Sequence, residues 1–318
     1  MNQKLISVIK KDFGVDEKTF IESIIDPKNA SAKGSILGAI SEVLLRRSLI
    51  REKFEVFRIK EKPEGGFDKK SDEARGDFYV KKKIEKKNKW LVIECKGLKS
   101  NSEKHAHDFY DRENCFNFLL RKLSKTDKKS IFERGYKTYL KSKENYENKN
   151  KNKKFPKFTW NKNFPGLETY DLNNLWKNED DLKKWIYSLP NNLFDPKNVD
   201  IGKGAISILM THMPSTRYGK YTNIKSTGPL KYEFGILALD LFYRTGKHEF
   251  IFTSSHDLNH QPASPEHLSQ NYTIDIMPYG LKKNPIINFP WYKSIDECIN
   301  NGNPVYREID KSQIDERI

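Results

Sequence analysis

The sequence predicts an α/β fold, and four stretches of the chain carry that prediction. Residues 90–93 (WLVI) form a short apolar run typical of a buried strand, and an earlier strand opens at Asp77 with the residues DFYV. Residues 35–49 have the apolar spacing of an amphipathic helix. Further apolar residues between Phe109 and Leu123 predict a helix that runs to about residue 125. Helix, strand, strand and helix therefore follow one another in the first part of the chain.

The remaining elements are predicted from the same two periodicities. The chain has 318 residues, of which 36% are hydrophobic, and this is enough for one large core. We expect the strand at residues 205–211 to extend the sheet that contains residues 90–93. The later hairpin would lie in that sheet or in a recognition lobe. The full set comprises helices at 5–12, 17–25 and 180–189, strands at 54–59, 205–211 and 272–277, and a hairpin of residues 233–243 and 249–254.

The charge balance indicates a polyanionic partner. Lys and Arg number 58 against 43 Asp and Glu, which leaves a net charge of +15 and a pI of about 9.4. No apolar run approaches a membrane-spanning length and the first residues do not resemble a signal peptide, so nucleic acid is favoured over a membrane. The three cysteines have no CxxC spacing, which argues against disulfides and structural zinc. A reducing compartment, hence the cytoplasm, is expected.

An acid-x-lysine sequence follows directly on the apolar run at 90–93. Side chains alternate along a strand, so Glu94 and Lys96 should share one face and Cys95 should point to the other. Asp77, at the start of the neighbouring strand, can lie beside Glu94. Carboxylates of Asp77 and Glu94 with the main-chain oxygen of Cys95 would form an oxygen-only pocket that suits Mg²⁺. Lys96 could then orient or deprotonate water and balance charge on a phosphate.

Context separates this acid-x-lysine from others in the chain. The same spacing recurs at several other acids because the chain is rich in lysine and glutamate, so the string alone has little value. Only Glu94 follows a four-residue apolar strand with an aspartate opening the strand before it. The alternative is a structural hairpin whose charged ends are simply solvated.

These residues resemble the signature of the PD-(D/E)xK nuclease superfamily, with Gly76-Asp77 in place of Pro-Asp and Glu94-Cys95-Lys96 as the second half. The resemblance covers roughly residues 34–125. It implies a restriction-endonuclease-like core, in which helices flank a central mixed sheet, with a C-terminal β-containing extension. It also implies Mg²⁺-dependent cleavage of double-stranded DNA in the manner of type II restriction enzymes. A homodimer, and a cognate DNA methyltransferase encoded nearby, are implied only by analogy.

The helix at residues 35–49 carries a carboxylate, Glu42, on its apolar side, where an isolated charge is costly. Members of the family resembled here often place an inward glutamate on the helix before the first core strand. That resemblance implies that Glu42 holds a metal-bound water or a second ion. The alternative is a helical ion pair with Arg46 at the i,i+4 spacing.

Several residues outside the core are candidates for DNA contacts. Arg75 precedes Asp77 and suits a phosphate. The Lys/Asn-rich run at 141–163 is either a mobile linker or a flap that grips phosphates through Lys149, Lys151, Lys153 and Lys154. Polar loops further along carry residue types that read base edges, namely Arg217, Asn259, His260 and Gln261. His256, His260 and His267 lack nearby cysteines, so we expect them at the surface or on DNA, not on a metal.

These observations divide the chain into three segments, which we expect to form one compact unit. Residues 1–130 would hold the N-terminal helices and the catalytic core, 131–200 the basic segment and a helix, and 201–318 the remaining core strands and the DNA-recognition region. Two other functions stay open: a repair or recombination nuclease such as a junction resolvase, and a DNA-binding protein without catalysis. No P-loop or S-adenosylmethionine loop is present in the sequence, which argues against a fused motor or methyltransferase.

Overall fold

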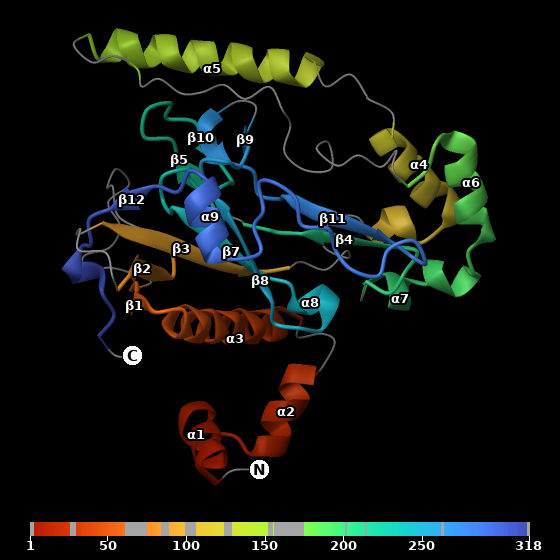
Figure 1. Ribbon diagram of the computed structural model, residues 1–318, viewed down its shortest axis with the longest axis horizontal. Helices are drawn as coiled ribbons and strands as arrows, with labels where there is room; N and C mark the ends of the chain where they lie inside the picture. Colours follow the sequence, from red (N-terminus) through yellow and green to blue (C-terminus); the bar gives the residue numbers. More distant parts are fainter. Residues whose placement is uncertain are drawn as a thin grey trace.

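The computed structural model shows how the chain surrounds one central sheet (Figure 1). It describes residues 3–25, 30–60, 75–83, 89–98, 106–123, 129–151, 155, 175–200, 202–213, 215–261 and 264–316. Helices α1 (Gln3–Phe13) and α2 (Glu17–Ile25) project from one end of the molecule and lead into the long helix α3 (Ala30–Arg51). All three lie where their apolar periodicity predicts helices.

The central sheet is mixed, as the sequence predicts. Its strand order is β1-β2-β3-β7-β8, and β12 pairs with the start of β3. Strands β3 and β7 are parallel, whereas every other pairing in this sheet is antiparallel. The strands are β1 (Phe54–Arg58), β2 (Phe78–Lys82), β3 (Trp90–Gly97), β7 (Ile236–Asp240), β8 (Phe250–Ser254) and β12 (Tyr306–Arg307).

One face of the sheet is covered by α3 and by the short helix α9 (Ile295–Asn301). Leu45 and Leu49 of α3 pack against Phe78 and Ile93, and all four side chains are at most 1% exposed. Burying a leucine of this kind stabilises the fold by roughly 1.5–3 kcal/mol. Because α3 lies directly on β1 and β3, polar side chains on the face of α3 that meets the sheet are held close to these strands.

The other face is covered by a separate antiparallel pair, β4 (Ile206–Met210) and β11 (Thr273–Pro278). The prediction that residues 205–211 extend the main sheet is therefore wrong. Both faces of β4 are buried, since Leu209 packs toward the main sheet while Ile206 and Ile208 pack into a second core. A fully apolar strand can thus form its own layer. The predicted hairpin, in contrast, does lie in the main sheet, as β7 and β8 joined through α8 (Phe242–Thr245).

The second core lies between β4 and helices from the middle of the chain. These helices are α4 (Arg112–Leu123), α6 (Glu179–Ser188) and α7 (Pro196–Asp200). Arg112 ties two of them together, because its guanidinium donates to the main-chain oxygens of Ile186 and Leu189 at 3.0 and 2.7 Å. The helices therefore buttress β4, which in turn covers the central sheet.

Helix α5 (Lys129–Lys149) shows that the Lys/Asn-rich run is not a mobile linker over residues 141–149, whereas a phosphate-gripping role of the run stays a prediction. The run is helical as far as Lys149, and Tyr146 of this helix packs edge-on against Phe155 and Tyr221. Aromatic contacts of this kind fix the helix along the molecule, at the end opposite α1 and α2 (Figure 1). Apart from Asn150, Lys151 and Phe155, the later part of the run lies outside the described residues.

Two short antiparallel strand pairs support the loop that carries Arg217. Strand β5 (Arg217–Tyr218) pairs with β6 (Lys225–Ser226), and β9 (His260–Gln261) pairs with β10 (Ser264–Leu268). Glu266 of β10 is fully buried and accepts from the main-chain nitrogen and the hydroxyl of Thr222, both at 2.7 Å. This carboxylate anchors the turn after β5 and so fixes the loop that carries Arg217.

Candidate active site

Asp77, just before β2, and Glu94 of β3 lie side by side on the central sheet, as the sequence predicts. Strands β2 and β3 are antiparallel, and Phe78 is paired with Ile93, so Asp77 falls beside Glu94. The main-chain nitrogen of Asp77 donates to the oxygen of Ile93 at 2.8 Å. The approach is so close that a Cβ at Gly76 would lie 2.6 Å from Val92 Cγ1 and 2.9 Å from the oxygen of Ile93. Glycine before Asp77 is therefore required by the local packing.

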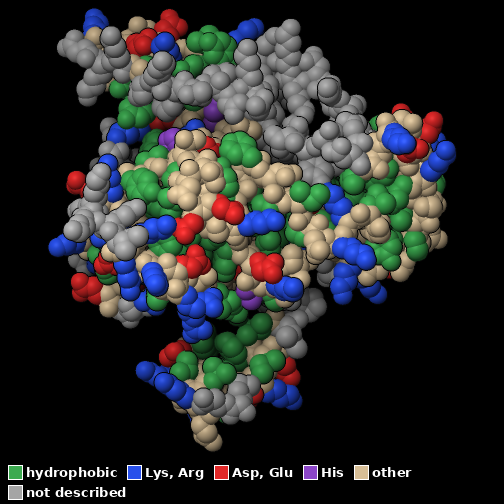
Figure 2. All heavy atoms as spheres, viewed as in Figure 1, with side chains coloured by type: hydrophobic (Ala, Val, Ile, Leu, Met, Phe, Trp, Pro, Cys, Tyr) green, Lys and Arg blue, Asp and Glu red, His purple; other side chains and the backbone are tan. Residues whose placement is uncertain are grey.

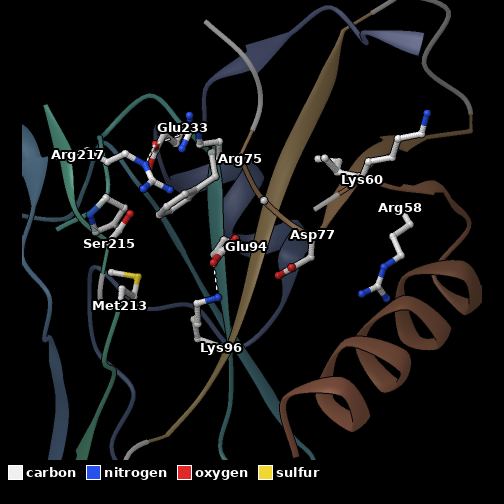
Figure 3. A pocket seen from close by; sticks show the side chains of 14 residues that line it. Arg58, Lys60, Arg75, Asp77, Glu94, Lys96, Met213, Ser215, Arg217 and Glu233 are labelled. Atoms are coloured by element: carbon white, nitrogen blue, oxygen red, sulfur yellow. Dashed lines mark hydrogen bonds and ion pairs between the residues drawn. The ribbon is translucent and has the colours of Figure 1, made fainter. Parts of the chain in front are cut away.

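Glu94 and Lys96 share one face of β3, while Cys95 is buried on the other face against α3. The ammonium of Lys96 forms an ion pair with Oε1 of Glu94. Asp77 is directed toward this pair, and its Oδ2 accepts from the main-chain nitrogen of Cys95 at 2.6 Å (Figure 3). The three charged side chains thus converge as the strand alternation predicts.

The electrostatics of this group differ from those of exposed residues. Burial and, to a smaller extent, the charge of Asp77 raise the pKa of Glu94 to about 7, although Lys96 opposes the shift. For Lys96, burial lowers the pKa, but Glu94 and Asp77 more than offset this and the net shift is upward. Lys96 is therefore a stable ammonium in this arrangement. Orienting water and balancing negative charge suit it better than removing a proton.

Glu42 of α3 lies near the same group but does not pair with Arg46. Its Oε2 instead accepts from Arg58 of β1 at 2.6 Å, so the predicted alternative of a Glu42–Arg46 pair is wrong. Burial raises the pKa of Glu42, Asp77 raises it as well, and Arg58 lowers it. Because the charge of Asp77 acts on the pKa of Glu42, these two carboxylates lie within electrostatic reach of each other. Glu42 belongs to α3, whereas Asp77 directly precedes β2.

A cavity of about 260 Å³ opens beside these side chains. It joins the site residues to two arginines predicted to contact DNA, Arg75 and Arg217 (Figure 3). Its wall consists of Arg58, Ile59, Lys60, Arg75, Gly76, Asp77, Glu94, Lys96, Met213, Ser215, Arg217, Pro229, Glu233 and Phe234. Positive side chains outnumber negative ones in this wall, which suits an anionic ligand.

Glu233 is the site residue that the sequence analysis missed. It precedes β7 and is 5% exposed, and its Oε1 lies 2.9 Å from Nε of Arg217 and 3.6 Å from Nε of Arg75. A local signal did exist, since Glu233, like Asp77, is an acid at the opening of an apolar strand. Its partners, however, come from two distant parts of the chain.

The other predicted base-reading residues lie elsewhere. His260 is buried, and its Nδ1 lies 2.8 Å from the oxygen of Gln261. The amide of Gln261 bonds to Ser226 and to the oxygen of Leu268, and the oxygen of Asn259 accepts from Tyr272. The side-chain contacts of His260 and Gln261 would have to open before either could reach a base edge, whereas Asn259 accepts from Tyr272 only through its main-chain oxygen in this contact. The role of all three in readout stays a prediction.

Two further expectations concern histidines and lysines. His260 and His267 are 4% and 0% exposed, so the expectation that they lie at the surface is wrong for both. Lys149 and Lys151 are exposed at the end of α5, as a phosphate-gripping role requires. Lys153 and Lys154 lie outside the described residues.

The donor set at Asp77 and Glu94 fits a hard cation in part. Two adjacent carboxylates and an open cavity supply oxygen ligands and room for water, as Mg²⁺ prefers, while the main-chain oxygen of Cys95 stays a predicted ligand. Across the ranges that the structure describes, no group of three or more His, Cys, Asp or Glu side chains is placed to hold a metal. The remaining ligands would therefore be water or the oxygen atoms of a substrate.

Comparison of the chain with family models, with curated proteins and with solved structures gives no match. Of the helices in the described ranges, none combines the length and the apolar character needed to cross a membrane. The function must therefore be argued from the geometry of the site.

Proposed function

We propose that this protein is an Mg²⁺-dependent, sequence-specific endonuclease for double-stranded DNA, of the PD-(D/E)xK type and similar to type II restriction enzymes. The observation that carries the proposal is the convergence of Asp77, Glu94 and Lys96 in the wall of a basic cavity. A structural hairpin with solvated ends would leave Glu94 and Lys96 exposed. Here their side chains are only 19% and 34% exposed.

The roles of the residues follow from their positions. Asp77, Glu94 and the main-chain oxygen of Cys95 would hold Mg²⁺, which when bound polarises a phosphate oxygen and activates water. Lys96, held as an ammonium by Glu94, would orient the attacking water and balance charge on the phosphate. Glu42 would hold a metal-bound water or a second ion from the α3 side, and the attack would be in line, leaving 5′-phosphate and 3′-hydroxyl ends.

The partners follow from charge and from the proposed reaction. A net charge of +15 supports a DNA partner, and a cytoplasmic location is proposed with it. Cutting both strands of a palindrome suits two-fold symmetry, so a homodimer belongs to the proposal, as does a DNA methyltransferase encoded nearby.

Incubation with plasmid DNA and Mg²⁺ tests this function directly. We expect discrete fragments with Mg²⁺ and no cleavage when a chelator removes the metal. Random nicking would point to a repair nuclease instead, and DNA binding without cutting would point to a non-catalytic binding protein. Either of these last two results would contradict the proposal.

Replacing Asp77 by asparagine is expected to weaken metal binding because one of two anionic ligands becomes neutral. The affinity for Mn²⁺, followed by electron paramagnetic resonance, should fall by at least about tenfold. Removing a residue that only supports a metal ligand already lowers metal affinity by about this factor. Asp296→Asn is the matched control, since Asp296 is about half exposed and pairs with Lys82 near the surface. An unchanged Mn²⁺ affinity in Asp77→Asn would remove Asp77 from the metal site.

Replacing Glu42 by glutamine is expected to slow cleavage without unfolding the protein. Glutamine can still accept from Arg58, so the free energy of unfolding should change by about 1 kcal/mol or less. The single-turnover rate should fall by about tenfold or more, which corresponds to a transition state less stable by about 1.4 kcal/mol. Glu52→Gln, at the exposed residue that directly follows α3, is the control. A wild-type rate in Glu42→Gln would leave Glu42 with a structural role only.

A further inference from the structure

Glu233 is a buried carboxylate whose position is fixed from several sides. Its Oε2 accepts from the main-chain nitrogen of Leu230 at 3.0 Å, and its own main-chain nitrogen donates back to Leu230 at 3.1 Å. Its main-chain oxygen accepts from the nitrogen of Arg75 at 3.0 Å. The following glycine, Gly235, donates to Val92 of β3. The carboxylate is therefore held rigidly against the strand that carries Glu94.

Two guanidiniums converge on the other oxygen of this carboxylate. Arg217 approaches Oε1 at 2.9 Å and Arg75 at 3.6 Å, and both do so through Nε. One carboxylate oxygen thus faces two guanidiniums. Holding two like charges together in a partly buried place costs free energy, and a bound anion would offset that cost.

This arginine pair belongs to the same cavity as the candidate catalytic residues. Figure 3 shows Arg75, Arg217 and Glu233 on one side of the cavity, with Glu94 and Lys96 beside them and Arg58 on the opposite side. The charge of Glu233 also contributes to raising the pKa of Glu94, because the two carboxylates are near each other. An anion held by the arginines would therefore lie next to the Glu94–Lys96 pair.

We propose that Glu233 is a positioning residue that holds Arg75 and Arg217 as a two-arginine subsite for one phosphate group. The planar fork of a guanidinium matches the oxygens of a phosphate, and two such groups fixed by a common carboxylate lose little freedom on binding. This inference rests on the proposed function for its substrate, a phosphodiester of DNA. It gives Arg217 a phosphate contact in place of the predicted base contact.

A role of Glu233 as a metal ligand is the competing explanation. Its Oε2, however, already accepts from the main-chain nitrogen of Leu230, and its Oε1 pairs with Arg217 and Arg75. A metal would have to displace these guanidiniums from Oε1. The two explanations differ in what removal of the charge does, because a positioning residue supports anion binding whereas a metal ligand supports cation binding.

Binding of inorganic phosphate to the purified full chain, without metal or DNA, tests the subsite independently of cleavage. Titration calorimetry should show that Arg75→Ala and Arg217→Ala each weaken phosphate binding by at least about tenfold, as expected when a charge-assisted hydrogen bond is removed. Lys82→Ala is the matched control, since it removes one positive charge from a pair with Asp296 outside the cavity. It should leave phosphate affinity within about twofold of wild type.

The direction in which Glu233→Gln changes phosphate affinity distinguishes a positioning role from simple repulsion of anions. If Glu233 only repelled anions, removing its charge would tighten phosphate binding, whereas a positioning role predicts weaker binding although the site becomes more positive. Equal or tighter binding in folded Glu233→Gln would overturn the inference, as would a loss of Mn²⁺ affinity with phosphate affinity unchanged. Folding is checked by circular dichroism, and Arg217→Ala, whose side chain is one-third exposed, keeps the test valid if Glu233→Gln fails to fold.

The subsite and the proposed function can fail separately. A chain that binds phosphate in this way but does not cut DNA keeps the subsite and loses the nuclease proposal. A chain that cuts DNA while its phosphate affinity is insensitive to Arg75→Ala, Arg217→Ala and Glu233→Gln keeps the nuclease and loses the subsite.

Discussion

Glu94→Gln and Lys96→Ala should each abolish DNA cleavage and leave DNA binding nearly unchanged. Removing one preorganised charge from a reacting centre typically costs about 10²–10³-fold in rate, and here each residue is the ion-pair partner of the other. Removal of either one therefore disturbs both. Binding should persist because most of the affinity of a basic protein for DNA comes from phosphate contacts spread over its surface.

The measurement combines single-turnover cleavage with Mg²⁺ and duplex binding with Ca²⁺, followed by fluorescence anisotropy. Glu94→Gln keeps the shape of the side chain, so it avoids leaving the ammonium of Lys96 beside an empty space. Glu55→Gln is the control, because Glu55 lies on strand β1 of the same sheet and pairs with Lys81 at 3.4 Å. Cleavage at the wild-type rate by folded Glu94→Gln would remove the catalytic role of this site altogether.

The local sequence was sufficient to predict that Asp77, Glu94 and Lys96 lie together. Asp77, Glu94 and Lys96 belong to two strands that are adjacent in the chain and antiparallel in the sheet. Alternation along β3 determines that Glu94 and Lys96 share a face, and the hairpin determines which residue lies beside them. The mixed sheet and the helix that covers it were predicted from the same local patterns together with the family resemblance.

The remainder of the site depends on contacts between distant parts of the chain. Strand β3 lies parallel to β7, and the loop before β7 brings Glu233 to Arg75 and Arg217. No periodicity specifies such a pairing, because any apolar strand of suitable length could occupy that position. The partner of β4 was mispredicted for the same reason: its burial on both faces is consistent with a place in the main sheet and equally with a separate layer.

Residue type alone does not show which side chains line the cavity. Arg217 and Gln261 both have side chains that can read bases and both are bonded within the protein, but only Arg217 of these two lines the cavity. Glu42 shows the same limitation, since its spacing from Arg46 suggested a helical pair while the fold supplied Arg58. A charged side chain takes whichever partner tertiary packing brings nearest.

The affinity for DNA should fall by about 10³–10⁵-fold between about 50 and 200 mM salt, if roughly six to ten phosphates are contacted. A net charge of +15 makes contacts on this scale reasonable. Figure 2 shows lysine and arginine side chains spread over the visible face among acidic ones, without a single basic stripe on that face. The lysines at and after the end of α5 are the set to test.

Replacing Lys149, Lys151, Lys153 and Lys154 together by alanine should make the dependence of log affinity on log salt less steep, by about 0.9 for each phosphate that the variant no longer neutralises. The cut sequence should not change, because phosphate contacts carry no direct sequence information. A matched control replaces Lys4, Lys10, Lys11 and Lys18, which are exposed on α1 and α2 at the opposite end of the molecule from α5 (Figure 1). Both variants lose the same charge, so a change in slope confined to the first set locates the DNA along α5. Equal slopes in the two variants would show that only net charge matters, and an altered fragment pattern in the first would mean that this segment reads bases.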